Sequence, residues 1–328
     1  MRRALHPYLV NEPFGDPGLF VDFLFERRAL LFDLGDIRAL APRKLLRVSD
    51  IFVSHCHMDH FMGLDWFLRI CLGRARAVRL YGPPGFIARV EARLAGYTWN
   101  LLHRYENDFG LEVIEVLEPG RVRRAHFHVR QAFRREKAGE AALEDGILLD
   151  EPGLRVRCAL LDHGTPCLGF AMAESQHVNI WKTRLGELGL PVGPWLQGLK
   201  HAVLAGRGDD FEISGPDGRP IALGALRDCL RVTPGMKLAY VTDVVHSPGN
   251  AQRIVELARD ADKLFIESVF LDEAAARAAD KLHLTAGQAG RLARAAGVKA
   301  VEPFHFSPIY REREAELRAE LERAYRGA

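Results

Sequence analysis

Four possible metal ligands lie within six residues in the N-terminal part of the chain. The segment reads His-Cys-His-Met-Asp-His from His55 to His60, and it directly follows an apolar run at 51–53. Imidazole and carboxylate donors together suit Zn²⁺, Mn²⁺ or iron, and they suit Ca²⁺ poorly. In an extended segment His55 and His57 project to the same side, whereas Asp59 and His60 begin the next turn and can face a second ion. A lone histidine here would be a structural residue at a strand end, but this cluster predicts a site for two metal ions.

Two ions need further ligands from elsewhere in the chain. The candidates are His163, Asp243 and His305, and each comes just after a run of residues with strand character. The ends of neighbouring strands meet at one edge of a sheet, which is where α/β proteins place their sites. A single histidine after a strand is more often structural. Metal binding is favoured here because all three residues share this position. An aspartate among such ligands can bridge two ions held about 3.5–4 Å apart.

The composition is that of an ordinary globular protein. Of 328 residues, 48% are hydrophobic and 27% are charged, which suits one large α/β domain or one domain with an insertion. The net charge of +2 means that an RNA-binding surface has to be a local patch. Five cysteines without a C-x-x-C pair favour a reducing cytoplasm. Because no signal-peptide run or apolar run of about 20 residues occurs, we expect a cytoplasmic protein without a membrane span.

The hydrophobic pattern predicts an α/β layered protein with helices outside its sheets. Strands are expected in 19–34 (two, with a charged turn), 48–54, 78–81, 111–117, 122–133, 154–161, 237–242, 263–267 and 299–304. Helices are expected at 63–72, 86–94, 250–260 and 285–296 and over the charged C-terminal residues 311–327. The charged residues 134–146 contain two glycines and predict a loop. The Gly- and Pro-rich stretch 174–235 predicts an excursion from the core.

Six ordered motifs resemble the ribonuclease Z family of the metallo-β-lactamase superfamily. The cluster at 55–60 is similar to the H-x-H-x-D-H signature of the superfamily. The later motifs are L-D-H-G-T-P at 161–166, G-L-P-V-G-P at 189–194 with L-K at 199–200, I-E-S-V-F at 266–270, A-A-D-K-L-H-L-T at 278–285 and H-F-S-P-I-Y at 305–310. The resemblance covers roughly 50–65 and 154–310.

The resemblance implies a fold, a ligand set and an assembly. The fold is a four-layer αβ/βα sandwich over 1–328, with an arm inserted at 174–235 that is a possible tRNA-binding exosite. Two zinc ions, or Mn²⁺ or iron in their place, would lie at the shared edge of the sheets. One zinc would be held by His55, His57, His163 and Asp243, and the other by Asp59, His60, His305 and the bridging Asp243. The resemblance also implies a homodimer in which the arm of one subunit serves the site of the other.

The chain departs from the family pattern in four places. The usual F-L-G-T-G opening is replaced by A-L-H-P-Y-L-V-N-E-P-F-G-D-P-G, and the acidic D-C-G-E-G turn by D-L-G-D-I at 33–37. The G-D-T motif becomes T-D-V at 242–244, and Ile309 stands where the family has an arginine. The metal ligands are retained, so these departures concern the identity of the substrate more than the chemistry.

Three residues receive catalytic roles from the resemblance. A zinc-activated hydroxide would attack the phosphodiester, and Asp59 would orient or deprotonate this nucleophile. His283, paired with Glu267, is the candidate donor of a proton to the leaving 3′ oxygen. The alternative for His283 is a packing role at a helix N-terminus, where Thr285 is the expected N-cap residue.

Two aspartates are candidates to fix the imidazole tautomers. Asp33 and Asp162 each follow a strand-like run, but the sequence does not show which histidine either would reach. A plain turn aspartate at the end of a strand is the alternative for both.

Two regions are candidates to bind RNA. The arm contributes Gly193, Pro194, Lys182, Arg184 and Lys200, and it is otherwise a surface hairpin insertion. The arginine-rich segment 121–137 could follow a phosphate backbone, or it could be a solvated strand face. Trp181 and Trp195 could stack on bases, but burial within the arm is the expected outcome.

Three functions are compatible with these residues. The leading hypothesis is an endoribonuclease Z-like phosphodiesterase that processes the 3′ ends of precursor tRNA. The alternative keeps the metal site but hydrolyses a small phosphodiester, sulfate ester or lactone. The third is a metal-stabilised RNA-binding protein without catalysis. Asp59 and His60 argue against the third, because a structural zinc needs only one closed tetrahedral site.

Overall fold

The computed structural model describes residues 5–24, 26–118, 120–174 and 176–327. The chain forms two compact units. Unit 1 comprises residues 1–148, 157–171 and 238–328, and unit 2 comprises residues 149–156 and 172–237. All the candidate metal ligands belong to unit 1.

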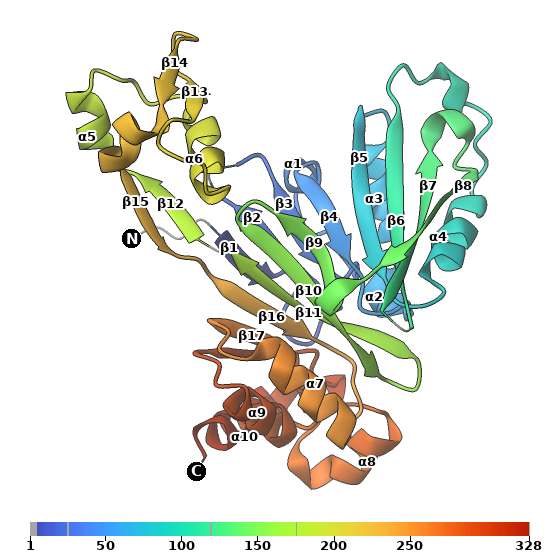
Figure 1. The fold of residues 1–328 in the computed structure, drawn as a ribbon. Helices are drawn as coiled ribbons and strands as arrows, with labels where there is room; N and C mark the ends of the chain where they lie inside the picture. Colours follow the sequence, from blue (N-terminus) through green and yellow to red (C-terminus); the bar gives the residue numbers. More distant parts are fainter. Residues whose placement is uncertain (1–4, 25, 119, 175, 328) are drawn as a thin grey trace. The chain divides into compact units, whose positions relative to one another are not determined.

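The first sheet of unit 1 has eight strands in sequence order (Figure 1). They are β1 (Leu5–Leu9), β2 (Leu19–Phe23), β3 (Ala29–Phe32), β4 (Val48–Phe52), β5 (Arg76–Gly82), β6 (Phe109–Leu117), β7 (Arg121–His128) and β8 (Arg135–Ala142). Strands β3 to β6 are parallel, and the strands on either side of them are antiparallel. The helices are α1 (Pro42–Leu45), α2 (Met58–Phe61), α3 (Leu64–Cys71) and α4 (Phe86–Ala95), with 3₁₀ turns η1 (Leu102–Arg104), η2 (Val129–Gln131) and η3 (Glu144–Gly146).

Helix α3 is amphipathic and packs on the first sheet. Its buried residues Leu64, Phe67, Leu68 and Cys71 recur at the spacing of one helix face. They join a core cluster with alternate residues of the strands, such as Ile51 of β4. Burial of this face fixes the start of α3, and therefore the position of the histidine-rich segment between β4 and α3.

The second sheet has the strand order β18-β17-β16-β11-β10-β9. The strands are β9 (Ile147–Glu151), β10 (Leu154–Asp162), β11 (Pro166–Glu174), β16 (Lys237–Val241), β17 (Lys263–Glu267) and β18 (Val301–Phe304), of which the last three are parallel. The helices are α7 (Pro248–Ala258), α8 (Ala275–Asp280), α9 (Ala286–Ala295) and α10 (Glu314–Arg326), with 3₁₀ turns η5 (Asp272–Ala274) and η6 (Pro308–Arg313). Residues of α7, α9 and α10 share a core cluster with the outer face of β16 and β17.

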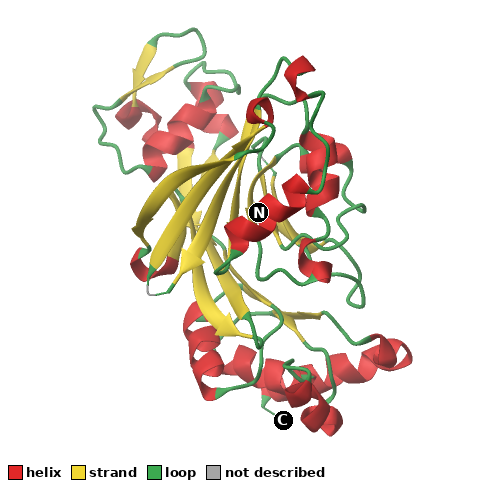
Figure 2. Ribbon diagram, turned by 90° about the vertical axis from the view of Figure 1, so that its right-hand side faces the viewer, coloured by secondary structure: helices red, strands yellow, loops and turns green. Residues whose placement is uncertain are grey.

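The two sheets of unit 1 pack face to face through aromatic side chains. Phe170 of β11 lies 5.7 Å from the rings of both Phe32 and Phe52, and the Tyr240 ring lies 6.0 Å from that of Phe32. Because side chains alternate along a strand, Ala239 and Val241 face the outer helices while Tyr240 faces inward. Helices therefore cover the outer face of each sheet (Figure 2), which confirms the predicted four-layer sandwich.

Unit 2 has a small core of its own. Its strands are β12 (Gln176–Ile180) paired with β15 (Leu230–Pro234), and β13 (Glu212–Ser214) paired with β14 (Pro220–Ala222). Its helices are α5 (Lys182–Glu187), α6 (Leu196–Leu204) and the 3₁₀ segment η4 (Leu223–Cys229). Buried residues such as Leu185, Leu199 and Leu226 pack together.

The predicted loop at 134–146 is wrong. Residues 135–142 form β8, which pairs with β7 at the edge of the first sheet. Seven of its eight residues are exposed, so it lacks the apolar alternation that predicts a strand. In the described part of the chain, no helix is long and apolar enough to span a membrane.

Candidate metal centre

The candidate ligands gather at one edge of unit 1, where strands of both sheets end. His55 and His57 lie between β4 and α2, whereas Asp59 and His60 lie on α2. His163, Asp243 and His305 follow β10, β16 and β18 within two residues. Neighbouring parallel strands such as β16 to β18 end side by side, so the residues that follow them are brought together.

The first group consists of His55, His57, His163 and Asp243. One ligand atom from each of these residues lies within 4.8 Å of the others. The Asp243 Oδ2 atom is 3.5 Å from both His55 Nε2 and His163 Nε2. Three imidazoles and one carboxylate around one point match the donor set of a zinc site.

The second group consists of Asp59, His60 and His305, whose ligand atoms also lie within 4.8 Å of one another. His60 Nε2 is 3.5 Å from Asp59 Oδ2 and 3.3 Å from Asp243 Oδ2, and His305 Nδ1 is 3.0 Å from Asp243 Oδ1. Asp243 thus lies between the two groups, in the position of a bridging carboxylate.

Several ligand atoms of this cluster are buried without a hydrogen-bond partner. Among the described residues these atoms include His55 Nε2 and His60 Nε2. Buried polar atoms are nearly always paired, so an unpaired ring nitrogen in each of the two ligand groups needs a partner of another kind. A bound cation is such a partner, and the residues present therefore fit a metal centre.

The electrostatics of the cluster also suit cations. Burial lowers the pKa of His55 to about 2, so its imidazole is neutral, which is the form that coordinates a metal. Burial also lowers the pKa of His60, but the carboxylates of Asp243 and Asp33 raise this pKa by more than burial lowers it, and it lies at about 10. Burial raises the pKa of Asp59, whereas His305 and His60 lower it to about 2. The Asp59 carboxylate is therefore ionised and attracts positive charge.

Four residues around the cluster have left-handed backbone conformations. The φ angles are 59° at Asp33, 44° at Asp243, 62° at Leu282 and 58° at His305. Such angles are uncommon outside glycine and are concentrated at functional sites. Asp33 and His305 directly follow strands β3 and β18, and Asp243 lies two residues after β16, where the sharp turn redirects the side chain.

The two candidates for fixing tautomers have different roles. The Asp33 Oδ2 atom lies 3.0 Å from His60 Nδ1, within the interior of unit 1. Asp162 is exposed and accepts a hydrogen bond from Gly164 N at 2.8 Å, so it is a turn aspartate. His163 Nδ1 instead lies 2.9 Å from the carbonyl oxygen of Leu282.

His283 is paired with Glu267 as predicted. His283 Nδ1 lies 2.7 Å from Glu267 Oε2, and Glu267 Oε1 accepts hydrogen bonds from the backbone N–H groups of Val244 and Leu284. Burial lowers the pKa of His283, but the Glu267 carboxylate raises it by more, so the pKa lies above its ordinary value. A capping box at Thr285 begins α9 and fixes the chain just after His283.

The structure also places His283 beside the candidate metal ligands. Its ring lies 4.9 Å from the ring of His163 and 5.7 Å from that of His305. Ligand atoms of Asp243, Glu267, His283 and His305 come within 4.8 Å of one another. Glu267 is fully buried, and both of its carboxylate oxygens are hydrogen-bonded within the protein.

The altered N-terminal segment packs against the turn that carries His305. The Phe306 N–H donates to Pro13 O at 2.8 Å, and the rings of Phe14 and Phe306 meet edge to face at 5.4 Å. Asp16 Oδ2 accepts a hydrogen bond from the Asp36 N–H, in the turn that replaces the family's acidic one. The altered N-terminal segment therefore contacts both the residue that follows His305 and the altered turn at 33–37.

The arm residues predicted to bind RNA lie in unit 2. Lys182 and Arg184 are on α5, Gly193 and Pro194 precede α6, and Lys200 is on α6. The burial expected for Trp181 is wrong, because this side chain is 56% exposed and lies under the Arg184 guanidinium at 5.4 Å. Trp195 is partly buried, and its Nε1 donates to Pro191 O.

The arginine-rich segment 121–137 forms β7 and its surroundings, and carboxylates neutralise much of it. Arg121 and Arg123 both pair with Glu140 of β8. Further pairs are Arg124–Glu112 at 3.6 Å and Arg135–Glu91 at 3.4 Å. This pairing favours the solvated strand face over a phosphate-binding stripe.

Sequence comparison agrees with this geometry. The family model described as the metallo-beta-lactamase superfamily matches residues 16–129. A protein named Ribonuclease Z from Deinococcus radiodurans is 32% identical over 310 residues, covering 93% of this chain and 90% of that protein. A second protein of that name, from Rippkaea orientalis, is 31% identical over 270 residues, covering 81% of this chain and 71% of that protein.

Solved structures share the fold. The metallo-beta-lactamase fold protein YhfI from Bacillus subtilis superposes with a TM-score of 0.54 at 12% identity, over 97% of this chain and 92% of that one. The short form of human tRNase Z superposes with a TM-score of 0.50 at 17% identity, over 93% of each chain. Because the identity to the Deinococcus protein extends over at least 90% of both sequences, the chain belongs to the ribonuclease Z family, a family of metal-dependent hydrolases with the metallo-β-lactamase fold.

Proposed function

We propose that the protein is a dinuclear zinc endoribonuclease that cuts precursor tRNA at its 3′ end. The observation that carries this proposal is Asp243, which lies within 3.5 Å of ring nitrogens from both ligand groups. In this proposal His55, His57 and His163 would hold one ion, Asp59, His60 and His305 would hold the other, and Asp243 lies between the two groups.

Zinc bound in these two groups supplies a nucleophile at neutral pH and neutralises charge on the phosphodiester. The Asp59 side chain is 43% exposed, so it can accept a hydrogen bond from the attacking water and orient it. As the bond between phosphorus and the leaving 3′ oxygen breaks, that oxygen needs a proton. The His283 side chain is 17% exposed, and with Nδ1 held by Glu267 its Nε2 is available to donate this proton.

The first test uses a precursor tRNA with a 3′ trailer. We expect the zinc-loaded protein to make a single cut that releases the trailer, a chelator to abolish cleavage, and added zinc to restore it. Bis(p-nitrophenyl) phosphate serves as the comparison substrate. If only this small ester were cut at a useful rate, the tRNA assignment would fail and the alternative would stand.

The alternative is a hydrolase of a small phosphodiester, sulfate ester or lactone. One observation favours it: Ile309, which replaces the family's arginine, is 54% exposed and offers no positive charge. The ligand groups are the same in both proposals, so only the substrate comparison separates them.

We also propose that unit 2 binds the tRNA. It carries Lys182 and Lys200 on two neighbouring helices and an exposed Trp181 ring, which are groups that contact phosphates and bases. Replacing Lys182 and Lys200 with alanine should weaken tRNA binding and reduce the slope of log K against log salt by about 0.7–1 for each phosphate that is no longer neutralised. Hydrolysis of bis(p-nitrophenyl) phosphate should stay unchanged.

The control is Lys299→Ala, which removes a cation of unit 1 that is paired with Asp262. An unchanged salt slope in the arm variant, or an equal change in the control, would assign tRNA binding to another surface.

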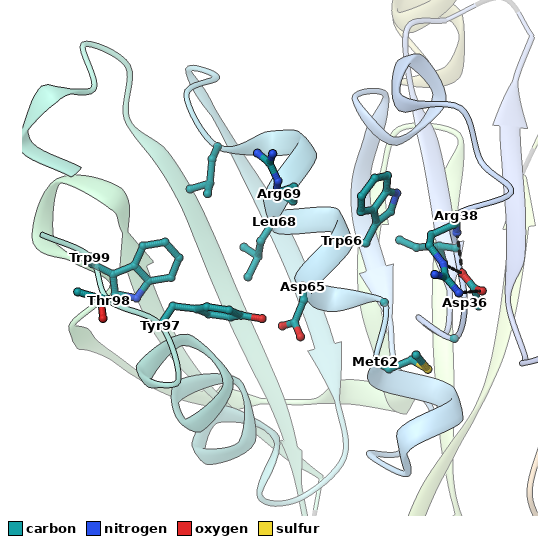
Figure 3. Close-up of a pocket in the computed structure, with 14 residues that line it drawn as sticks. Asp36, Arg38, Met62, Asp65, Trp66, Leu68, Arg69, Tyr97, Thr98 and Trp99 are labelled. Carbon is teal, nitrogen blue, oxygen red and sulfur yellow. Dashed lines mark hydrogen bonds and ion pairs between the residues drawn. The ribbon is translucent and has the colours of Figure 1, made fainter. Parts of the chain in front are cut away.

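A homodimer is the third part of the proposal. Large apolar side chains are exposed on α2 and α3, between these two helices, and in the segment after α4. They are Met58, Met62, Trp66, Tyr97, Leu101 and Tyr105. Met62, Trp66 and Tyr97 line a mainly apolar cavity of about 550 Å³, which contains none of the metal ligands (Figure 3). Exposed apolar surfaces of this kind mark protein interfaces, and we propose that a second copy of the chain covers this one.

Trp66→Asp should therefore shift the protein from dimer to monomer in sedimentation equilibrium, because it places a charge in the buried contact. Leu24→Asp, at another exposed apolar position of unit 1, should leave the mass unchanged. A dimer that survives Trp66→Asp would exclude this surface. The five cysteines are free thiols, which supports a reducing compartment, and we propose the cytoplasm.

A further inference from the structure

Asp33 is a buried carboxylate at the centre of a hydrogen-bond network. It follows β3 and has no solvent exposure. Its Oδ1 accepts a hydrogen bond from the Ser54 N–H at 2.6 Å, and its Oδ2 accepts from Ser54 Oγ and Tyr240 OH, both at 2.9 Å. His60 Nδ1 lies 3.0 Å from the same Oδ2 atom. An ionised carboxylate is an acceptor only, so all of these neighbours act as donors toward it.

The contact with His60 determines which ring nitrogen faces the ligand cluster. Because Asp33 accepts from Nδ1, that nitrogen carries a proton. The lone pair of the neutral ring is then on Nε2, which lies 3.3 Å from Asp243 and 3.5 Å from Asp59. Asp33 therefore fixes the coordinating nitrogen of one histidine of the second group.

Ser54 extends this control to the first group. Its hydroxyl has a single proton, which is donated to Asp33 Oδ2, so toward other neighbours the oxygen can only accept. His55 Nδ1 lies 3.1 Å from this oxygen and must be the donor. The lone pair of His55 is then on Nε2, which has no hydrogen-bond partner and lies 3.5 Å from Asp243.

Tyr240 connects the second sheet to the same carboxylate. It lies on β16, three residues before Asp243, and is 1% exposed. Its hydroxyl donates to Asp33 from across the interface between the two sheets. The orientation of Asp33 is thus held by groups from both sheets that supply the metal ligands.

We propose that Asp33 is a positioning residue that fixes the coordinating nitrogen of one histidine at each of the two metal positions. It acts directly on His60 and, through Ser54, on His55. Tyr240 holds the carboxylate in place. The inference rests on the proposed dinuclear centre. The new element is that one carboxylate outside the ligand groups orients a histidine at both metal positions. Ser54 Oγ lies 3.1 Å from His55 Nδ1 and 3.4 Å from His60 Nδ1, and His60 Nδ1 keeps its shorter contact with Asp33 when Ser54 is removed. Removal of Ser54 should therefore affect mainly the first position, whereas removal of the Asp33 charge should affect both.

Zinc binding to the metal-free full chain, measured by competition with a chelator, tests this inference. Groups that orient metal ligands typically contribute about 10- to 100-fold to affinity. We expect Ser54→Ala to weaken one of the two binding steps in this range and to leave the other within about threefold. Asp33→Asn should weaken both steps, and Tyr240→Phe should weaken both by less. Thermal unfolding of the metal-free variants shows whether each one folds.

Nitrogen NMR of ¹⁵N-histidine-labelled, metal-free protein gives a second readout that a loss of packing would not change. In the wild type the His55 proton should be on Nδ1, and in Ser54→Ala it should redistribute toward Nε2. His163 is the internal control, because its Nδ1 is held by the Leu282 carbonyl and should keep its proton in every variant.

The outcomes separate this inference from the proposed function. If the wild type binds two zinc ions but Ser54→Ala changes neither step, or changes both equally, the inference is overturned and the proposed function stands. If the wild type binds no zinc, the proposed centre fails, and the position of the His55 proton still decides whether Ser54 orients that ring.

Discussion

Asp59→Asn is expected to lower the rate of precursor-tRNA cleavage by about 10³-fold, the scale of losing a general base. The Asp59 carboxylate lies 3.5 Å from His60 Nε2 and 3.3 Å from His305 Nε2, and its side chain is 43% exposed, whereas that of Asp243 is 3% exposed. The neutral amide has the same shape but removes the negative charge, so it can no longer take a proton from the attacking water. Single-turnover cleavage with saturating enzyme measures the effect.

The affinity for tRNA should change little in this variant, because the proposed tRNA contacts lie in unit 2. Asp262→Asn is the matched control, since it removes the charge of a partly buried aspartate outside the ligand groups. Cleavage by Asp59→Asn at close to the wild-type rate would contradict the role given to this carboxylate.

His283→Ala is expected to show an effect that depends on the leaving group. Cleavage of RNA should fall by about 10²- to 10⁴-fold, because the leaving 3′ oxygen of a ribose is a poor leaving group without a proton. Hydrolysis of bis(p-nitrophenyl) phosphate should fall by less than about tenfold, because p-nitrophenolate leaves without protonation. The two substrates are compared under single-turnover conditions, together with the zinc content of the variant.

Zinc content separates proton donation from metal binding at this position. His283 comes within 4.8 Å of Asp243 and His305, so the geometry permits either role. Equal decreases on both substrates together with the absence of one zinc ion would make His283 a ligand. Glu267→Gln should produce the same dependence on the leaving group to a smaller extent, because it removes the charge that positions His283.

The ligand positions could be predicted because they follow from residue type and topology. His163, Asp243 and His305 come after strands, and strands of one sheet bring the residues that follow them to a common edge. The spacing of apolar residues likewise predicted α3 and α4, since each buries one face against the first sheet.

The hydrogen-bond network around the ligands could not be predicted in this way. Ser54 and Tyr240 both donate hydrogen bonds to Asp33. Nothing in their local sequence distinguishes them from ordinary core residues. The partner of His163 is the main-chain carbonyl of Leu282, and a main-chain group has no side-chain signal. These contacts depend on how the two sheets pack, which the hydrophobic pattern of each strand does not specify.

Strand β8 could not be predicted from the sequence for a different reason. Most edge strands are identified by alternating polar and apolar residues, but residues 135–142 are exposed on both faces. Their pairing with β7 is stabilised by the backbone ladder and by ion pairs such as those of Glu140 with Arg121 and Arg123. Composition alone therefore predicted a loop.

The most direct test of the central claim is a crystal structure of the zinc-loaded protein with anomalous scattering recorded at the zinc edge. Two peaks about 3.5–4 Å apart are expected, one among His55, His57 and His163 and the other beside Asp59, His60 and His305, with Asp243 between them. A single peak, or peaks away from Asp243, would contradict a dinuclear centre and the mechanism built on it.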